Sequence, residues 1–303
     1  MILIFTRLYK AWRRRQAAAV KGSAAPAKSR AARLSPVGPS AASRGQLALL
    51  LHQVAFDLKA SLRNPRARFL TFALPILLMV ILAGVFGHGT TTVDGVRIQL
   101  SRYYVPGVLA MSIITASYGM LVISMATARE TGVLKRRRST PVPPLFIVAG
   151  QALSTAITVV IMSTILLVIA KVGYGVGFGA GALVSIAITA VVGTLAFACI
   201  AFLVAGLLGS VDAAQPIVQA TTMPLYFISG IWIPAQSLGS TLRSVASVFP
   251  VEHLASALHL ASVHDSFSGA FSPKDLLVLG VWGLGAVVLA ARRFSWLPSA
   301  ATA

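Results

Sequence analysis

The chain has 303 residues, of which 56% are hydrophobic and only 11% are charged. Soluble domains carry about 25% charged residues, so this composition indicates an integral membrane protein rather than a soluble domain. The formal net charge of +19 would suggest a nucleic-acid partner for a soluble protein. Here the basic residues gather on one side of the expected membrane topology, which excludes that interpretation.

Residues 1–45 form a basic segment rich in Ala, Ser, Pro, Lys and Arg, and the first acidic residue of the chain is Asp57. Hydrophobic periodicity is absent after Trp12, which predicts a disordered cytoplasmic tail lying near anionic lipid. A short apolar patch precedes the basic residues, the reverse of the order in a secretory signal. The acid-poor composition leaves an organelle transit peptide open as the alternative.

Residues 46–68 carry apolar side chains at helical spacing with polar residues between them. This pattern predicts an N-terminal amphipathic helix that lies in the membrane interface. An ordinary packed soluble helix is disfavoured because a membrane span follows almost directly after Pro65. The predicted membrane domain covers 46–293, and a short C-terminal tail covers 294–303.

Six apolar runs have about the length that a helix needs to cross a bilayer core of roughly 30 Å. Prolines at 75, 216 and 224 predict kinks rather than breaks, because neighbouring helices can satisfy the freed carbonyls. The predicted fold class is therefore all-α integral membrane, with six transmembrane helices. The predicted spans lie at about 69–87, 104–128, 145–170, 180–208, 215–233 and 275–291.

Two short amphipathic segments lie between the fifth and sixth spans, near 238–248 and 251–264. Each is too short or too polar to cross a bilayer. We expect short external helices that form a cap dipping into the outer leaflet, rather than a flexible loop. Small residues recur in the fourth span and predict close helix packing, within the subunit or at a dimer interface.

Of the 26 Lys and Arg residues, 21 fall on the side that holds both termini and the loop at 129–144. The remaining five, among them Arg97 and Arg102, fall on the opposite side. The positive-inside rule therefore places both termini in the cytoplasm, with the chain in the cell inner (plasma) membrane.

No pattern in the chain predicts an enzyme. A Gly-rich phosphate-binding loop is absent, so ATP hydrolysis is expected in a separate subunit, and no catalytic or cofactor-binding residue is predicted. His253 and His259 are six residues apart, which is poor spacing for one helical face, so no metal site is predicted either. The single cysteine, Cys199, excludes a disulfide within the chain. Ionisable residues are nearly absent from the spans, which argues against an ion-coupled transporter.

A short polar and basic segment at 129–141 lies between the second and third spans. It is too short to fold as a domain, but two spans hold it, so it can pass a push from a cytoplasmic partner to the membrane helices. The run Lys135–Arg138 has an equally good interpretation as a topology signal. Glu130 is not needed for topology, and the helix dipole favours a carboxylate near a helix start. Both points favour a role for Glu130 in binding a partner.

The order of these features resembles the type-2 ABC exporter permeases, over roughly 46–293. The segment Arg129–Arg136, with Thr140–Pro144, is similar to that family's first cytoplasmic loop. The segment Phe227–Gly230, with Ile233-Pro234 and the later Phe249-Pro250 and His253, resembles its late signature. The basic N-terminal region, the interfacial helix and the six spans complete the resemblance.

The resemblance implies a permease that forms a homodimer or heterodimer and docks cytoplasmic ABC ATPase subunits. Two departures, the long N-terminal extension and Arg136–Arg138, leave the identity of the ATPase open. Contacts of an ATPase-coupling loop are implied at Arg129, Glu130, Thr131, Gly132 and Leu134. Architectural positions are implied at Phe227, Gly230, Pro234 and Pro250.

The expected function is the permease subunit of an ATP-driven exporter that moves a hydrophobic drug or lipid-like compound outward, as in drug resistance. The mid-span aromatics are few, which favours an apolar cargo over a sugar. A polysaccharide or glycolipid exporter, or a membrane scaffold or immunity factor without a transport role, stays open as an alternative. Expected partners are an ABC ATPase and membrane lipids.

Overall fold

The computed structural model describes residues 48, 50–59, 63, 65, 69–93, 95–131, 144–208, 210–234 and 237–293. These residues belong to one of two compact units, Gln46–Ala303. The other unit, Met1–Gly45, lies outside the described residues, as does the predicted C-terminal tail at 294–303. The predictions for the two tails therefore stay predictions.

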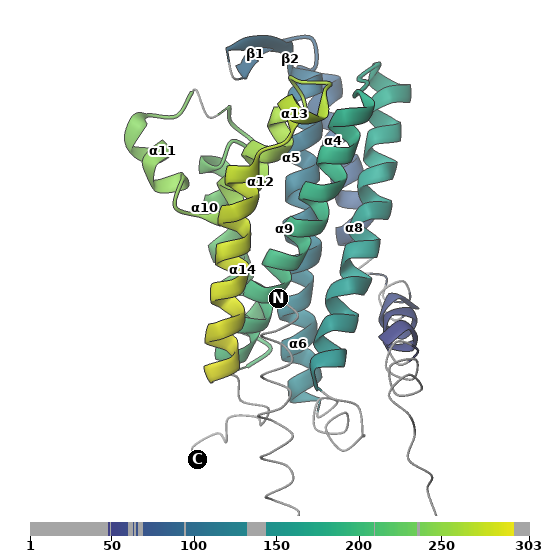
Figure 1. The fold of residues 1–303 in the computed structure, drawn as a ribbon, viewed down its shortest axis with the longest axis vertical. Coiled ribbons are helices and arrows are strands. Elements are labelled where there is room, and N and C mark those ends of the chain that lie inside the picture. The colour runs from purple at the N-terminus through teal and green to yellow at the C-terminus, as the bar shows by residue number, and fades with distance from the viewer. Residues whose placement is uncertain are drawn as a thin grey trace, which may run out of the picture. The chain divides into compact units, whose positions relative to one another are not determined.

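Long helices make up most of the membrane unit (Figure 1). Residues 50–59 are helical, within the segment where an interfacial helix is predicted. Two π-helical segments, η1 (Phe69–Ala73) and η2 (Thr115–Gly119), continue directly into α-helices. The α-helices from Leu74 onward are α4 (Leu74–Phe86), α5 (Leu100–Ile114), α6 (Met120–Glu130), α8 (Pro144–Tyr174), α9 (Ala180–Leu207), α10 (Ala214–Ile228), α11 (Ser240–Ala246), α12 (Pro250–Leu260), α13 (Phe267–Ala270) and α14 (Pro273–Arg293).

Four helical stretches among the described residues are long and apolar enough to cross a membrane. They coincide with the second, third, fourth and sixth predicted spans. The first predicted span corresponds to a shorter apolar helix, Thr71–Phe86, and the fifth to α10, which has 15 residues. The count of six spans thus stays a prediction. The four stretches are Leu100–Glu130, Val148–Tyr174, Ala180–Leu207 and Pro273–Ala290.

One part of the all-α prediction is wrong. The strands β1 (Thr90–Val93) and β2 (Val96–Gln99) form an antiparallel hairpin in which Thr90 lies opposite Gln99. The sequence carries a signal for it, because three threonines precede an Asp-Gly pair, the strongest short hairpin signal. Gly95 has φ 76°, the left-handed conformation that a tight hairpin turn needs.

The three prolines at 75, 216 and 224 do not break the helices that hold them, and the predicted kinks stay predictions. Pro75 lies in the first turn of α4, directly after η1, and α10 continues through Pro224. The π-helical segment η2 lies within the second span, after Pro106 of α5, and none of its own residues is a proline. Single π-turns are common at functional sites, and nothing in the sequence pattern predicts this one.

Two helices, α11 and α12, lie where the short external helices were predicted, and their place outside the membrane stays a prediction. The longer one, α12, packs against α5, α9 and α14. Its residues Leu254 and Leu258 are fully buried. This burial excludes a flexible loop and fixes α5, α9 and α14 relative to one another at one end of the bundle.

α9 packs against α8, α14, α6 and α12. Small residues permit this close approach. A methyl group added to Gly193 would lie 2.6 Å from Leu254 Cδ1, and one added to Gly283 of α14 would lie 3.0 Å from Ala196 Cα. The small residues of the fourth span therefore serve packing within the subunit.

A matched pair of substitutions in α14 tests this packing. Gly283→Ala is expected to cost about 1–2 kcal/mol of unfolding free energy, because the added methyl group pushes α14 away from the α9 backbone. The same methyl at Gly280 meets nothing within 4 Å, so Gly280→Ala is expected not to lower stability. Thermal unfolding midpoints in detergent measure both. Equal midpoints for the two variants would contradict the close contact of α14 with α9.

Candidate functional site

The predicted coupling loop begins at Arg129, in the last turn of α6. Its side chain is buried, with 8% of its surface exposed. Nη1 donates a hydrogen bond to the carbonyl of Ala205 at 3.3 Å, and Nη2 donates one to the carbonyl of Leu208. These carbonyls lie at the C-terminal end of α9, where main-chain oxygens lack helical partners and the helix dipole favours a cation. Arg129 therefore ties the end of α6 to the end of α9.

The next two residues face the solvent. Glu130 ends α6 and is exposed, and Thr131 is exposed beside it. Thr131 Oγ1 donates to the carbonyl of Thr127 at 2.7 Å, which closes the helix end. Gly132 and Leu134 lie outside the described residues. The predicted coupling residues thus separate into a buried anchor, Arg129, and an exposed carboxylate at Glu130.

A second group of contacts surrounds Gly230, just after α10. Gly230 has φ 79°, a conformation that favours glycine. Its carbonyl oxygen accepts one hydrogen bond from the hydroxyl of Tyr103 and one from Nε2 of His259 at 3.1 Å. The rings of Tyr103 and His259 stack with their centroids 4.3 Å apart. This group, named the Gly230 hub below, joins the end of α10 to α5 and α12.

His259 is enclosed in the hub. Because Nε2 faces a carbonyl oxygen, Nε2 carries the ring hydrogen, and Nδ1 has no hydrogen-bond partner among the described residues. Burial lowers the pKa of His259 to about 4. The ring is therefore neutral at physiological pH.

The other three architectural positions lie on or beside α10 and at the start of α12. Phe227 is exposed on α10 with 51% of its surface accessible, and Pro234 is half-buried, its carbonyl accepting from the amide of Ser237 at 2.8 Å. Pro250 is buried at the start of α12. Its missing amide hydrogen costs nothing in the first turn of a helix.

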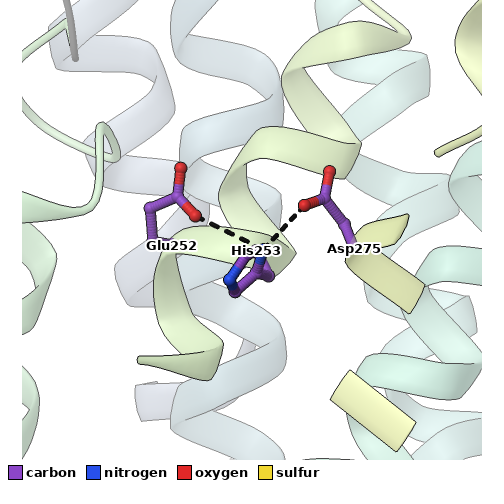
Figure 2. Close-up of side chains that lie close together, drawn as sticks. All are labelled: Glu252, His253 and Asp275. Atoms are coloured by element: carbon purple, nitrogen blue, oxygen red, sulfur yellow. Dashed lines mark hydrogen bonds and ion pairs between the residues drawn. The ribbon is translucent and has the colours of Figure 1, made fainter. Parts of the chain in front are cut away.

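Charged side chains at the start of α12 meet a charged side chain at the start of α14. Figure 2 shows His253 between two carboxylates, Glu252 beside it in the first turn of α12 and Asp275 at the start of α14, with both carboxylates paired to its ring. His253 Nδ1 lies 2.7 Å from Asp275 Oδ1 and 3.5 Å from Glu252 Oε2. On the other side of the ring, Nε2 lies 2.9 Å from the carbonyl oxygen of Ser247. We name this group the Glu-His-Asp cluster.

Asp275 is also part of the N-terminal cap of α14. Its Oδ2 accepts a hydrogen bond from the hydroxyl of Ser272 at 2.7 Å, and its amide donates to Ser272 Oγ at 3.4 Å. This reciprocal pairing is a variant of the capping box, which satisfies donors at a helix start. Burial raises the pKa of the Glu252 carboxyl, and the positive charges of His253 and Lys274 oppose that rise.

Comparison with known families decides the identity. Residues 50–261 match the family model of the ABC-2 type transporter. The chain belongs to the ABC-2 type transporter family. A comparison with curated proteins gave no match. The chain is thus a multi-pass membrane protein and a permease subunit of an ABC transporter, as the sequence resemblance implies.

The matched region of this ABC-2 permease contains the end of α6, the Gly230 hub and α12, whereas α14 lies beyond it. The Glu-His-Asp cluster was missed by sequence reasoning. A search for paired histidines does not find it, because its third member, Asp275, lies 22 residues beyond His253 and on another helix. The available signal was the polar Ser-Pro-Lys-Asp start of the last span.

Proposed function

We propose that this ABC-2 permease couples ATP hydrolysis by a separate cytoplasmic ABC ATPase to the outward movement of a hydrophobic drug or lipid-like compound. In this proposal the chain lies in the cell inner (plasma) membrane with both termini in the cytoplasm. It works as a homodimer or heterodimer, and residues 129–134 contact the ATPase. The main support is the structure of the end of α6, where an exposed Glu130 follows a buried Arg129.

The second span is suited to transmit a movement of the ATPase across the membrane. It is a continuous helical stretch of 31 residues, Leu100–Glu130, about 45 Å long at 1.5 Å per residue. At its cytoplasmic end Arg129 holds the end of α9, and at its outer end Tyr103 holds the carbonyl of Gly230. A movement of the 129–134 loop would therefore reach the hub and α12.

The polar groups within the spans support an apolar cargo. Tyr118 of η2 shares a hydrogen bond of 3.0 Å with Thr221 of α10, and Tyr226 of α10 lies 3.4 Å from Thr115 Oγ1. Both tyrosines are buried. Because their rings and hydroxyls are used in packing between η2 and α10, they do not offer the exposed aromatic faces that suit a polysaccharide.

Charge reversal at the loop tests the coupling. Glu130→Arg is expected to reduce copurification of the ATPase with the permease, and permease-stimulated ATP hydrolysis in liposomes, by about tenfold or more, because it opposes any basic groove that receives the carboxylate. Glu130 is exposed, so the thermal unfolding midpoint should stay unchanged.

Lys171→Glu is the matched control. Lys171 is exposed near the end of α8 away from the loop, so its reversal changes net charge without touching the 129–134 segment. It should leave both ATPase readouts at the wild-type level. If Glu130→Arg also left them there, the assignment of residues 129–134 as the coupling loop would fail.

A further inference from the structure

We propose that Glu252, His253 and Asp275 bind one divalent transition-metal ion with the ligand preferences of zinc, at the joint between α12 and α14. The proposal is independent of the coupling function argued above. It rests on the donor atoms, on the hydrogen bonds that orient them, and on the local charge.

The donor set fits such an ion. Each residue offers one ligand atom, and the three atoms lie within 4.8 Å of one another. Imidazole nitrogen and carboxylate oxygen both bind zinc at about 2.0–2.2 Å, which places ligand atoms of a tetrahedral site about 3.3 Å apart. The distances from His253 Nδ1 to Asp275 Oδ1 (2.7 Å) and to Glu252 Oε2 (3.5 Å) lie on either side of that value. Side-chain rotations that bring the two carboxylate oxygens, which lie within 4.8 Å of each other, to that separation would form the site.

Hydrogen bonds outside the cluster already orient two of the ligands. The Ser247 carbonyl can only accept, so Nε2 of His253, 2.9 Å away, carries a hydrogen and Nδ1 is the ring atom that faces both carboxylates. Asp275 is held in the same manner, since Oδ2 accepts from Ser272 and Oδ1 is directed at His253. Metal-binding histidines and carboxylates have such second partners, which fix their orientation and raise their affinity.

The charge of the cluster favours a divalent ion. Among the described residues, the Glu252 and Asp275 carboxylates form ion pairs with His253, and Lys274 adds a positive charge that acts on Glu252 from a longer distance. An imidazole proton offsets one of the two negative charges, whereas a divalent cation offsets both and bonds to all three atoms. His253 and Asp275 are buried, and Glu252 is the more open member, with 24% of its side chain exposed. Glu252 thus marks the route by which an ion enters and the side on which a water completes the coordination.

Zinc binding to the purified full-length permease tests the proposal. The protein is freed of any polyhistidine tag, stripped with a chelator and titrated with zinc chloride in competition with a fluorescent zinc indicator. We expect one zinc ion per chain. Glu252→Gln keeps the shape of the side chain but removes its charge, so it should weaken zinc binding about tenfold or more while the apo protein keeps its thermal unfolding midpoint.

His88→Gln is the matched control, because His88 is exposed and lies outside the cluster. It should bind zinc as the wild type does. His253→Gln should abolish the stoichiometric binding. The proposal is overturned if zinc does not bind at one ion per chain, or if Glu252→Gln and His88→Gln both bind it with wild-type affinity. In either case the cluster is a hydrogen-bonded ion pair between α12 and α14.

Discussion

Arg129→Met is expected to lower the unfolding free energy of the permease by about 2–4 kcal/mol. Two carbonyls at the end of α9 would lose a charged donor in a buried position, and the shorter side chain would leave space between α6 and α9. Arg129→Lys keeps the positive charge near the α9 terminus but not the two-pronged geometry, so it should lose an intermediate amount. Thermal unfolding in detergent, followed by circular dichroism, measures the three proteins.

Glu130→Gln is the control for this series. It changes the neighbouring residue of the same loop but removes no buried contact, so its midpoint should match that of the wild type. The series also separates two roles for Arg129. If Arg129→Met kept the wild-type midpoint but lost the ATPase, Arg129 would be a direct ATPase contact, as the family resemblance implies. A loss of stability would instead make it a positioning residue for the loop.

The spans were predictable from sequence because their signal is local. A run of about 20 apolar residues leaves few alternatives in a bilayer, and α8, α9 and α14 begin and end within a few residues of the predictions. The short helices α11 and α12 were also predictable, since their apolar periodicity lies within each short segment. The shorter α10 was predicted less well, because Pro224 and a polar stretch of threonines interrupt its apolar pattern.

The sites were not predictable in the same way, because they depend on residues far apart in the chain. Arg129 reads as one more charge in a basic loop, and its burial follows from carbonyls 76 and 79 residues later. His253 likewise meets Asp275 only when α12 packs against α14. Gly230 was placed by family resemblance, whereas its partners Tyr103 and His259 come from other helices. Local patterns therefore identified residues but not their roles.

The buried His259 of the Gly230 hub is expected to make the folded permease less stable in acid. The pKa of His259 is about 4 in the folded chain and about 6.5 in the unfolded chain, so between these values the unfolded chain binds the proton and the folded chain does not. The contribution of neutral His259 to the free energy of unfolding is thus fully present above pH 6.5, and this contribution is lost as the pH falls toward 4. The loss amounts to about 3 kcal/mol over this window, at about 1.4 kcal/mol per pKa unit.

The comparison of wild type with His259→Gln measures this effect. A glutamine amide can still donate to the Gly230 carbonyl, but it does not titrate, so the variant should lose less stability between pH 7 and pH 4.5. Carboxylates such as Glu252 titrate in both proteins and cancel in the difference. Equal losses in the two proteins would show that His259 takes up its proton within the folded hub. In that case Nδ1 would have a polar partner in the folded protein. The assignment of a neutral His259 as the link between α12 and the end of α10 would then be wrong.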